Sequence, residues 1–549
     1  MPMLTTLARF TSNAGLGSFS MSETRAQWKS KFGFILAASG SAIGLGNIVF
    51  FPANAYKYGG GAFYLPYFIA LFLVGIPVMI LEFGLGAWAK KSFPLAMRQA
   101  GGKAGEFAGW FAILNAAFIT MYYVTILGWV VGMAGEAISH PVNEVFQGAS
   151  TIPWFAAPDH TLSNPTGTFF AMISTWLPML GVLAVWILNV LLVSKGTKTI
   201  EAAVKIFVPL MWVTMIVLIF RGITLPGGPD GVAYLFSPDL SVLGRMDVWK
   251  GAMAQMFFTL SLGFGVMTAY ASYLPKKSDH SHNALTTSLL NCGFEWIAGV
   301  AIFSMLFALS IQPKASTLSM MFFIVPKGIA NLPAAAQEFA IGFFLLLLIA
   351  GLTSSISLVE ALVAAMQDKF RISRTKTLLI FGLFGFVGSA AFALPKVIDP
   401  GLSANGTLGL SLLDLMDHWA FGYGLLIVGL IECLVIGWGI GSHRIREFIN
   451  ANSKFHLGSW FDILIKFVIP LLLIVILLMN IIQGEIGGGL YGSAYKDAYK
   501  PQESALLKNL HVVVLLVWLV VTVSFAFLLT RARGVDEVEE VCLEEGGHR

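Results

Sequence analysis

The chain has 549 residues, of which 56% are hydrophobic and only 12% charged, and its mean hydropathy is +0.77. Apolar runs of eighteen or more residues recur along nearly the whole length, which excludes an ordinary soluble domain and predicts a polytopic helical membrane protein. The formal net charge of +4 says little by itself, and three scattered cysteines imply no disulfide framework.

Twelve apolar segments are long enough to cross a bilayer as helices. In chain order they are predicted at residues 32–57, 62–89, 107–135, 168–193, 200–222, 247–274, 284–311, 338–367, 377–396, 409–440, 461–483 and 509–530. An even number of crossings returns both ends of the chain to the same side.

Basic residues gather in alternate loops, whereas the intervening loops, notably 136–167, contain few. The basic positions are Arg25, Lys29, Lys31, Lys90, Lys91, Arg98, Lys103, Lys276, Lys277, Lys369, Arg371, Arg374, Lys376, Arg444 and Arg446. The positive-inside rule then predicts a multi-pass protein of the cell inner (plasma) membrane with both termini in the cytoplasm. Residues 1–24 lack the apolar core of a signal peptide, so we expect a flexible cytoplasmic segment there and a flexible acidic tail at 531–549.

Glycines interrupt two of the predicted spans. In the first span, SGSAIGLGN places Gly40, Gly44 and Gly46 within seven residues, and in the sixth, FFTLSLGFGVMTAYASY contains Gly263 and Gly265. Glycine inside a helix costs about 1 kcal/mol relative to alanine, so both helices are weak at these points. Paired breaks in corresponding halves of a transporter indicate an inverted repeat with the binding site between them. Close helix packing through small residues is the alternative interpretation.

Four separated motifs, in order, resemble the neurotransmitter:sodium symporter family over about residues 25–440. They are WKSKFGFILAASGSAIGLGNIVFFPANAYKYGGGAFYLPYFIALFLVGIPVMILEFGLG, the sixth-span motif, the Leu290–Asn291 region with Glu295, and AGLTSSISLVEALVAAMQD from Ala350. The resemblance implies sodium-coupled uptake of amino acids or related amines by alternating access.

The fold that this resemblance implies is an all-α integral membrane protein of about 12 transmembrane helices. It contains two inverted five-helix repeats, at about 25–222 and 247–440, with broken helices 1 and 6. Residues 441–530 add two helices that match no functional motif.

The resemblance also implies two sodium sites, where the breaks free backbone carbonyls to act as ligands. The first contains Ala42, Asn47, Thr259 and Asn291, and the carboxylate of the substrate completes it. The second contains Gly40, Ile43, Ala350, Thr353 and Ser354. For the two hydroxyl groups of the second site, hydrogen bonding within their own helix is the alternative.

An amino acid is expected between the breaks, because the N-termini of half-helices carry partial positive charge that suits a carboxylate. Amine-transporting relatives have an aspartate where this chain has Gly44, which favours an amino acid. The residues that the resemblance places around the substrate are Ser41, Ala42, Gly46, Ile119, Tyr123, Phe258, Thr259, Ser261, Phe264, Ser354 and Leu358. Tyr123 is expected to bond the carboxylate, and the mostly apolar, uncharged remainder favours a neutral, hydrophobic side chain.

Glu295 is an acid at membrane depth, a position that costs about 2.5–3.5 kcal/mol unless it is compensated. Two sodium ions with a zwitterion add two positive charges, and the resemblance implies that this carboxylate offsets one of them. Animal relatives have serine there and use chloride, so chloride-independent transport is expected. The alternative is a structural acid bonded to a neighbouring helix.

The resemblance places gates at both ends of the substrate path. Arg25 and Asp368 match the cytoplasmic charge pair, with Trp28 beside them. Asp417 matches the acidic member of the outer pair, but Phe50 stands where the family has arginine. Outer closure is therefore expected to rest on apolar contact of Phe50 with Tyr123, Phe258 or other residues of the vestibule.

Together these patterns predict a sodium-coupled symporter for a neutral, hydrophobic amino acid, embedded in the lipid bilayer, with sodium as coupling ion and no other cofactor. Two alternatives remain open: a proton-coupled amino-acid carrier of the same fold and a non-transporting amino-acid sensor. An enzyme is not expected, because no nucleophile–base pair or metal-ligand cluster occurs. No nucleic-acid partner is expected, and a homodimer is an open alternative for the assembly.

Overall fold

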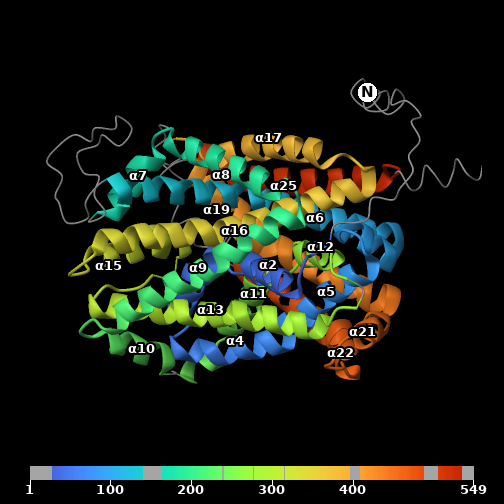
Figure 1. The fold of residues 1–549 in the computed structure, drawn as a ribbon, viewed down its shortest axis with the longest axis horizontal. Coiled ribbons are helices and arrows are strands. Elements are labelled where there is room, and N and C mark those ends of the chain that lie inside the picture. The colour runs from blue at the N-terminus through green and yellow to red at the C-terminus, as the bar shows by residue number, and fades with distance from the viewer. Residues whose placement is uncertain are drawn as a thin grey trace, which may run out of the picture.

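Helices account for the regular secondary structure of the described residues. The computed structural model describes residues 27–139, 164–237, 240–275, 277–314, 316–395, 408–486 and 505–534. Most of the long helices run along the long axis of the molecule, side by side (Figure 1). The all-α fold class predicted from the sequence is confirmed.

The helices of the first half of the chain are α2 (Lys31–Ala42), α3 (Phe51–Lys57), α4 (Tyr64–Ala70), α5 (Ile76–Ala89), α6 (Phe93–Ser139), α7 (Pro165–Ile173), α8 (Leu177–Val193), α9 (Thr197–Ile223) and α10 (Gly228–Phe236). Those of the second half are α11 (Met246–Thr259), α12 (Val266–Ser272), α13 (His280–Ala308), α14 (Thr317–Ser319), α15 (Val325–Ala330), α16 (Ala336–Phe370), α17 (Arg374–Phe392), α19 (Leu408–Met416), α20 (Leu426–Leu434), α21 (Ser442–Asn450), α22 (Ser459–Ile463), α23 (Ile469–Met479) and α25 (Ala505–Arg531).

Short 3-10 and π-helical segments join several of these helices into longer units. The 3-10 turns are η2 (Gly61–Phe63) and η5 (Leu240–Gly244), and the π-helical turns are η1 (Gly46–Phe50), η3 (Leu71–Gly75), η6 (Met320–Ile324), η7 (Asp417–Leu425), η8 (Val435–Gly441), η9 (Leu464–Val468) and η10 (Asn480–Ile486). Side chains cap some helix starts: the Ser30 hydroxyl accepts a 2.9 Å hydrogen bond from the Gly33 amide at the start of α2.

Both predicted helix breaks are present. The axis bends by 53° between α2 and the segment that begins with η1. Helices α11 and α12 are separated by residues 260–265, where Gly263 and Gly265 have φ angles of 77° and 72°. Glycine adopts this left-handed backbone readily, whereas other residues are strained in it. Spans one and six are therefore broken as predicted, and in span six two glycines adopt the left-handed backbone at the break.

The described residues form nine helices long and apolar enough to cross a membrane, or up to 11 if each of two bent pairs is one span. Neither number includes the α11–α12 pair, because these two short helices are separated by residues 260–265. A multi-pass membrane protein is confirmed, and the number twelve stays a prediction.

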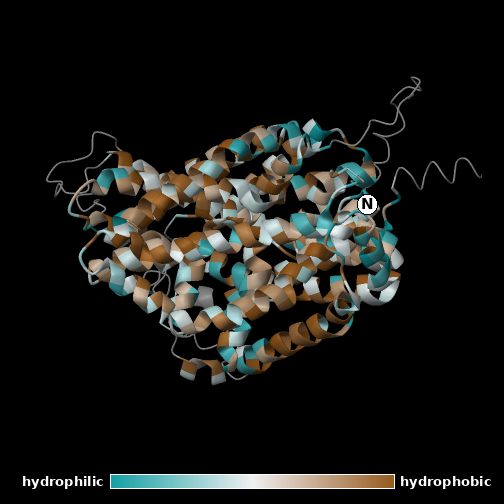
Figure 2. Ribbon diagram, turned by 60° about the horizontal axis from the view of Figure 1, so that its bottom comes forward, coloured by the Kyte–Doolittle hydropathy of each residue, from teal (hydrophilic) through white to brown (hydrophobic). Residues whose placement is uncertain are grey.

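Burial separates central helices from peripheral ones. The most apolar windows of α6, α13 and α16 are 72%, 67% and 67% buried, whereas those of α9, α17 and α25 are only 28%, 28% and 22% buried. Hydrophobic residues, coloured brown, make up much of the peripheral ribbon (Figure 2), as expected for a surface in contact with lipid. Helices α2 and α11 are drawn in the middle of the bundle (Figure 1), and residues 43–49 and 262–265 are buried, so the two breaks are enclosed by protein.

One predicted span differs in shape from the expectation. The segment 168–193 bends by 82° between α7 and α8 instead of forming one continuous helix. Thr175 Oγ1 accepts a 3.2 Å hydrogen bond from the Leu177 amide, and Pro178 lies in the first turn of α8, where its missing N–H is tolerated. These two residues start a new helix within the apolar run.

Candidate functional site

The two helix breaks face a small cavity in the centre of the bundle. Its volume is about 40 Å³, and its lining residues are Ala42, Gly44, Gly46, Asn47, Ile119, Tyr123, Phe258, Thr259, Ser261, Phe264, Ser354 and Leu358. They come from the first break, α6, α11 with the second break, and α16. All of the predicted substrate residues except Ser41 are in this lining, together with Gly44 and Asn47.

Ser41 takes part through its backbone instead of its side chain. Its hydroxyl turns away and donates a 2.6 Å hydrogen bond to Ser357 Oγ, which the sequence did not reveal. Its carbonyl accepts hydrogen bonds from Ser354 Oγ (2.9 Å) and Ser261 Oγ (3.2 Å). Ser41 thus joins the first break to the second break and to α16, and its place around the substrate stays a prediction.

The polar side of the cavity leaves no room for a side chain at Gly44. A Cβ atom built on Gly44 would lie 2.6 Å from Ser354 Oγ and 2.9 Å from the Tyr123 hydroxyl, which is closer than real Cβ contacts come. The Tyr123 hydroxyl accepts a 3.3 Å hydrogen bond from the Leu45 amide. The unwound backbone, the Tyr123 phenol and the Ser354 hydroxyl thus meet at one wall of the cavity.

The residues predicted for the first sodium site form one buried group, the Asn47 cluster (Ala42, Asn47, Thr259 and Asn291). Asn47 Nδ2 donates to Asn291 Oδ1 at 2.8 Å and to Thr259 Oγ1 at 3.1 Å. Asn291 Nδ2 also donates to Thr259 Oγ1, at 2.8 Å. Because the Asn47, Thr259 and Asn291 side chains and the Ala42 carbonyl supply neutral oxygens, and all four residues are at most 4% exposed, the donor set fits a monovalent cation that prefers oxygen ligands.

The residues predicted for the second sodium site also meet, and we name them the Thr353 cluster (Gly40, Ile43, Ala350, Thr353 and Ser354). Thr353 Oγ1 lies 2.8 Å from the Ala350 carbonyl oxygen and 3.5 Å from that of Ile43. Ser354 Oγ lies 3.4 Å from the Ala350 carbonyl oxygen. These hydroxyl groups bond within their own helix and also face the end of α2, so both interpretations offered by the sequence fit this geometry.

Glu295 lies directly behind the Asn47 cluster and is fully buried. Its Oε1 accepts hydrogen bonds from Thr259 Oγ1 (2.6 Å) and Gln255 Nε2 (2.8 Å), and its Oε2 accepts one from the Tyr67 hydroxyl. Three donors satisfy a buried carboxylate well, although none of them is a cation. Gln255 and Tyr67 were not predicted from the sequence.

Aromatic rings cover one side of the cavity, at what we call the Phe50 end of the bundle. The Phe50 ring centroid lies 5.1 Å from that of Phe258 and 6.3 Å from that of Phe421, and the latter two are 4.7 Å apart. All three pairs are edge-to-face, a favoured arrangement for aromatic rings. Contact with Phe258 agrees with the expectation for Phe50, whereas Phe421 was not anticipated.

Trp28 marks the opposite side of the cavity, the Trp28 end. Its indole Nε1 donates a 2.9 Å hydrogen bond to the Tyr270 carbonyl, and its amide donates to the Tyr273 carbonyl at 3.3 Å. Trp28 is only 5% exposed. Asp368 Oδ2 accepts a 2.5 Å hydrogen bond from the Ser92 amide. Arg25, its predicted partner, lies outside the described residues.

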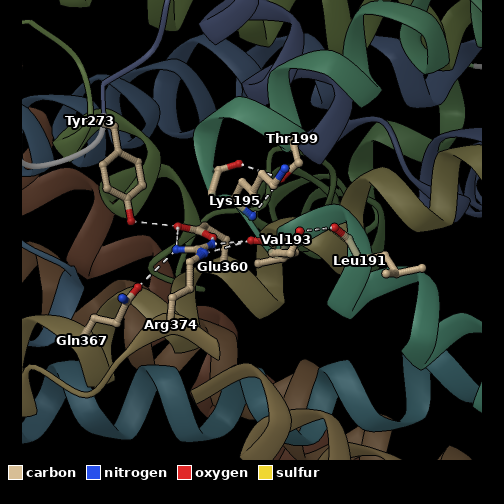
Figure 3. A network of polar contacts seen from close by, with 10 residues as sticks. Leu191, Val193, Lys195, Thr199, Tyr273, Glu360, Gln367 and Arg374 are labelled. Carbon is tan, nitrogen blue, oxygen red and sulfur yellow. Dashed lines mark hydrogen bonds and ion pairs between the residues drawn. The ribbon is translucent and has the colours of Figure 1, made fainter. Parts of the chain in front are cut away.

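A polar network near the Trp28 end was missed by the sequence reasoning. Glu360 accepts hydrogen bonds from the Tyr273 hydroxyl (2.8 Å) and from Arg374, with which it forms an ion pair (Figure 3). Arg374 also donates to the Val193 carbonyl, at 2.8 and 2.9 Å, and to Gln367 Oε1 at 3.2 Å. The network joins α8, α16 and α17 to the end of α12.

The chain matches a known family over most of its length. A family profile described as the sodium:neurotransmitter symporter family matches residues 25–145 and 149–530. The chain belongs to the sodium:neurotransmitter symporter family. Like other members of this family, it is a sodium-dependent symporter and not an enzyme.

Curated relatives of this symporter carry consistent names. An uncharacterized sodium-dependent transporter of Methanocaldococcus jannaschii is 40% identical over 466 residues, which cover 82% of this chain and 89% of the relative. An uncharacterized sodium-dependent transporter of Bacillus subtilis is 31% identical over 83% of this chain and 98% of its own length. The sodium- and chloride-dependent GABA transporter 2 of Bos taurus is 28% identical over 78% of this chain and 75% of its own.

Among solved structures, the symporter resembles MhsT, whose crystal structure was determined in complex with L-phenylalanine. The TM-score is 0.69 and the identity 31%, and the match covers 83% of this chain and 99% of MhsT. The similarity confirms the fold implied by the motifs, with its broken first and sixth spans.

Proposed function

We propose that this symporter takes up a neutral, hydrophobic amino acid together with sodium, by alternating access and without a requirement for chloride. One observation carries the proposal: the central cavity is lined both by polar groups of the helix breaks and by apolar side chains, and no charged side chain lines it. An amino acid with an apolar side chain likewise combines polar backbone groups with an apolar part.

The polar wall would hold the backbone of the substrate. Freed amides of the first break and the Tyr123 hydroxyl suit its carboxylate, and the lack of space at Gly44 excludes an acidic side chain that could pair with an amine. The apolar side chains of the lining, which are Ile119, Phe258, Phe264 and Leu358, would hold the side chain of the substrate. The L-phenylalanine in the MhsT complex is consistent with this class of ligand.

The coupling ions would occupy the two oxygen-rich groups. In the Asn47 cluster, the amide and hydroxyl oxygens would turn to sodium, and the substrate carboxylate would complete the shell. In the Thr353 cluster, carbonyls of the first break and the hydroxyls of α16 would bind the second ion. Glu295 supplies a fixed negative charge behind the Asn47 cluster, and such a charge makes an external anion unnecessary.

The orientation follows from the loop charges. We infer that the Trp28 end faces the cytoplasm and the Phe50 end the exterior of the plasma membrane, with both termini inside. Arg25, Trp28 and Asp368 would then close the inner gate, and Phe50 would close the outer one. The transporter core would comprise residues 25–440.

Uptake into proteoliposomes tests this function. With an inward sodium gradient, we expect accumulation of L-phenylalanine or L-leucine at least about tenfold above that with potassium, unchanged when gluconate replaces chloride. L-lysine, L-glutamate and the decarboxylated amine phenethylamine should not compete. Uptake driven by a proton gradient without sodium would favour the proton-coupled alternative, and tight binding without any uptake would favour a sensor.

A further inference from the structure

Two glutamates of the membrane core take no part in the sites described above. Glu82 of α5 and Glu432 of α20 are both 0% exposed. Glu82 Oε1 accepts a 2.8 Å hydrogen bond from the Gly263 amide, in the second helix break. Glu82 Oε2 and both carboxyl oxygens of Glu432 have no hydrogen-bond partner in the described part of the protein.

The two carboxyl groups belong to one site. Glu82 is bonded to Gly263, a Cβ on Gly263 would lie 3.7 Å from Val428 of α20, and Glu432 follows Val428 by about one helical turn on the same face of that helix. Among the described residues, the buried thiol of Cys433 also interacts with the pair, and η9, which packs against both α5 and α20, carries Lys466, which forms no ion pair with either carboxyl group. The neighbouring α12 and α21 contribute Thr268, Ile445 and Ile449, which carry no charge.

Two buried carboxyl groups without a cation cannot both be ionised. Like charges at short range in a medium of low polarity repel strongly, and water can satisfy lone pairs without offsetting the charge. Among the described residues no lysine, arginine or histidine forms an ion pair with either group. The ligand that makes such a pair stable is a proton.

We propose that Glu82 and Glu432 form a proton-binding site whose occupancy is linked to substrate binding through the Gly263 amide. With the second break ordered, the Gly263 N–H stabilises the Glu82 carboxylate and Glu432 keeps the one proton of the pair. When the break loosens, Glu82 loses this donor and takes up a second proton from water.

The link to the substrate follows from the second break itself. Thr259, Ser261 and Phe264, from α11 and this break, line the central cavity on the N-terminal and C-terminal sides of the Gly263 position. Sodium and an amino acid in the cavity would therefore order the break and favour the ionised form of Glu82. Binding then breaks the O–H bond of the Glu82 carboxyl group, the electron pair stays on its oxygen, and the proton passes to water.

By linkage, release of a proton on binding means that substrate affinity rises with pH, by up to about tenfold per pH unit where the pair titrates. This inference rests on the proposed function only in requiring that sodium and an amino acid bind in the cavity. The proposed proton site does not involve the Glu295 carboxylate.

Proton release can be measured with a pH indicator in weakly buffered detergent solution, while calorimetry on the same sample measures binding of L-phenylalanine in sodium chloride. We expect up to one proton released per ligand bound in the wild type. Glu82→Gln keeps an acceptor for the Gly263 amide but cannot ionise, so it should release none and lose the pH dependence of affinity. Glu136→Gln, which removes a buried acid of α6 elsewhere, is the matched control and should behave as the wild type.

Glu432→Gln provides an independent variant in case Glu82→Gln does not fold. It removes the neighbouring acid, so Glu82 should ionise more easily and release should shift to lower pH. Binding without proton release by the wild type would overturn the proton site while leaving the proposed function standing. Release from Glu82→Gln equal to that of the wild type, or an unshifted pH range in Glu432→Gln, would also overturn it.

Discussion

The hydroxyl of Tyr122 donates a 2.7 Å hydrogen bond to Asp417 Oδ1. The acid that matches the outer gate of the family is thus held by a phenol of α6. Phe50, which replaces the arginine, packs edge-to-face against Phe258 and Phe421 instead. At the proposed outer gate, aromatic contact of Phe50 would therefore take the place of an ion pair with Asp417, which predicts different consequences for substitution of the two residues.

Phe50→Ala should impair transport more than Asp417→Asn. Removal of a partly buried phenylalanine forfeits about 1–3 kcal/mol of closure, whereas asparagine keeps an acceptor for Tyr122 and loses about 0.5–1.5 kcal/mol. Cysteine accessibility in the vestibule should report a more open outer gate in Phe50→Ala, with little dependence on salt. Phe384→Ala, at a lipid-facing position of α17 that is 65% exposed, is the control. A larger defect in Asp417→Asn at equal expression would contradict this account of the gate.

Gly44→Ala should abolish amino-acid binding while the protein still folds. The new Cβ would lie within 3 Å of both Ser354 Oγ and the Tyr123 hydroxyl, on the wall assigned to the substrate carboxylate. Gly422→Ala serves as the control, since a Cβ there meets no atom within 4 Å. Calorimetry should show affinity reduced by at least about 100-fold in the first variant only. Unchanged affinity in Gly44→Ala would place the substrate elsewhere.

Glu295→Ser should make transport depend on chloride. The substitution removes the fixed charge but leaves the Tyr67, Gln255 and Thr259 donors facing the vacated space, and three hydrogen-bond donors suit an anion. Uptake by this variant should fall at least about tenfold when gluconate replaces chloride, while the wild type is unaffected. If the variant transports equally well in both salts, charge compensation by Glu295 is the wrong explanation.

At the Trp28 end, Arg374→Met should be far more damaging than Tyr273→Phe. The first change leaves the buried Glu360 carboxylate without its cation, at a cost of about 3–5 kcal/mol, whereas the second removes one hydrogen bond worth about 0.5–1.5 kcal/mol. Thermal unfolding in detergent should rank the variants in this order. Adding Glu360→Gln to Arg374→Met should recover part of the loss, and no recovery would show that the ion pair is not the cause.

The sequence predicted the helix breaks and most of the cavity, because both depend on local features. Gly263 and Gly265 can be recognised as weak points of a helix without any knowledge of their neighbours, and the family motifs carry the lining residues with them. The fold class follows equally from apolar runs whose lengths match a bilayer.

Contacts between distant spans could not be predicted in the same way. In the sequence, Arg374 is one of several basic loop residues, and nothing near it in the chain indicates that it pairs with Glu360 in the preceding span. A signal was nevertheless present: the argument that singled out Glu295, an acid at membrane depth, applies equally to Glu82, Glu360 and Glu432. The turn of the Ser41 hydroxyl toward Ser357 and the position of Phe421 depend on side-chain packing, which no local pattern encodes.

The central claim is that sodium and the amino acid share one site, and equilibrium binding of L-phenylalanine tests it most directly. Affinity should fall at least about 100-fold when choline or potassium replaces sodium, and sodium affinity should rise equally when the amino acid is present, because coupling is reciprocal. Thr353→Val should weaken sodium binding, whereas Thr522→Val, which removes a buried hydroxyl of α25, should not. Affinity that is the same with and without sodium would contradict the account.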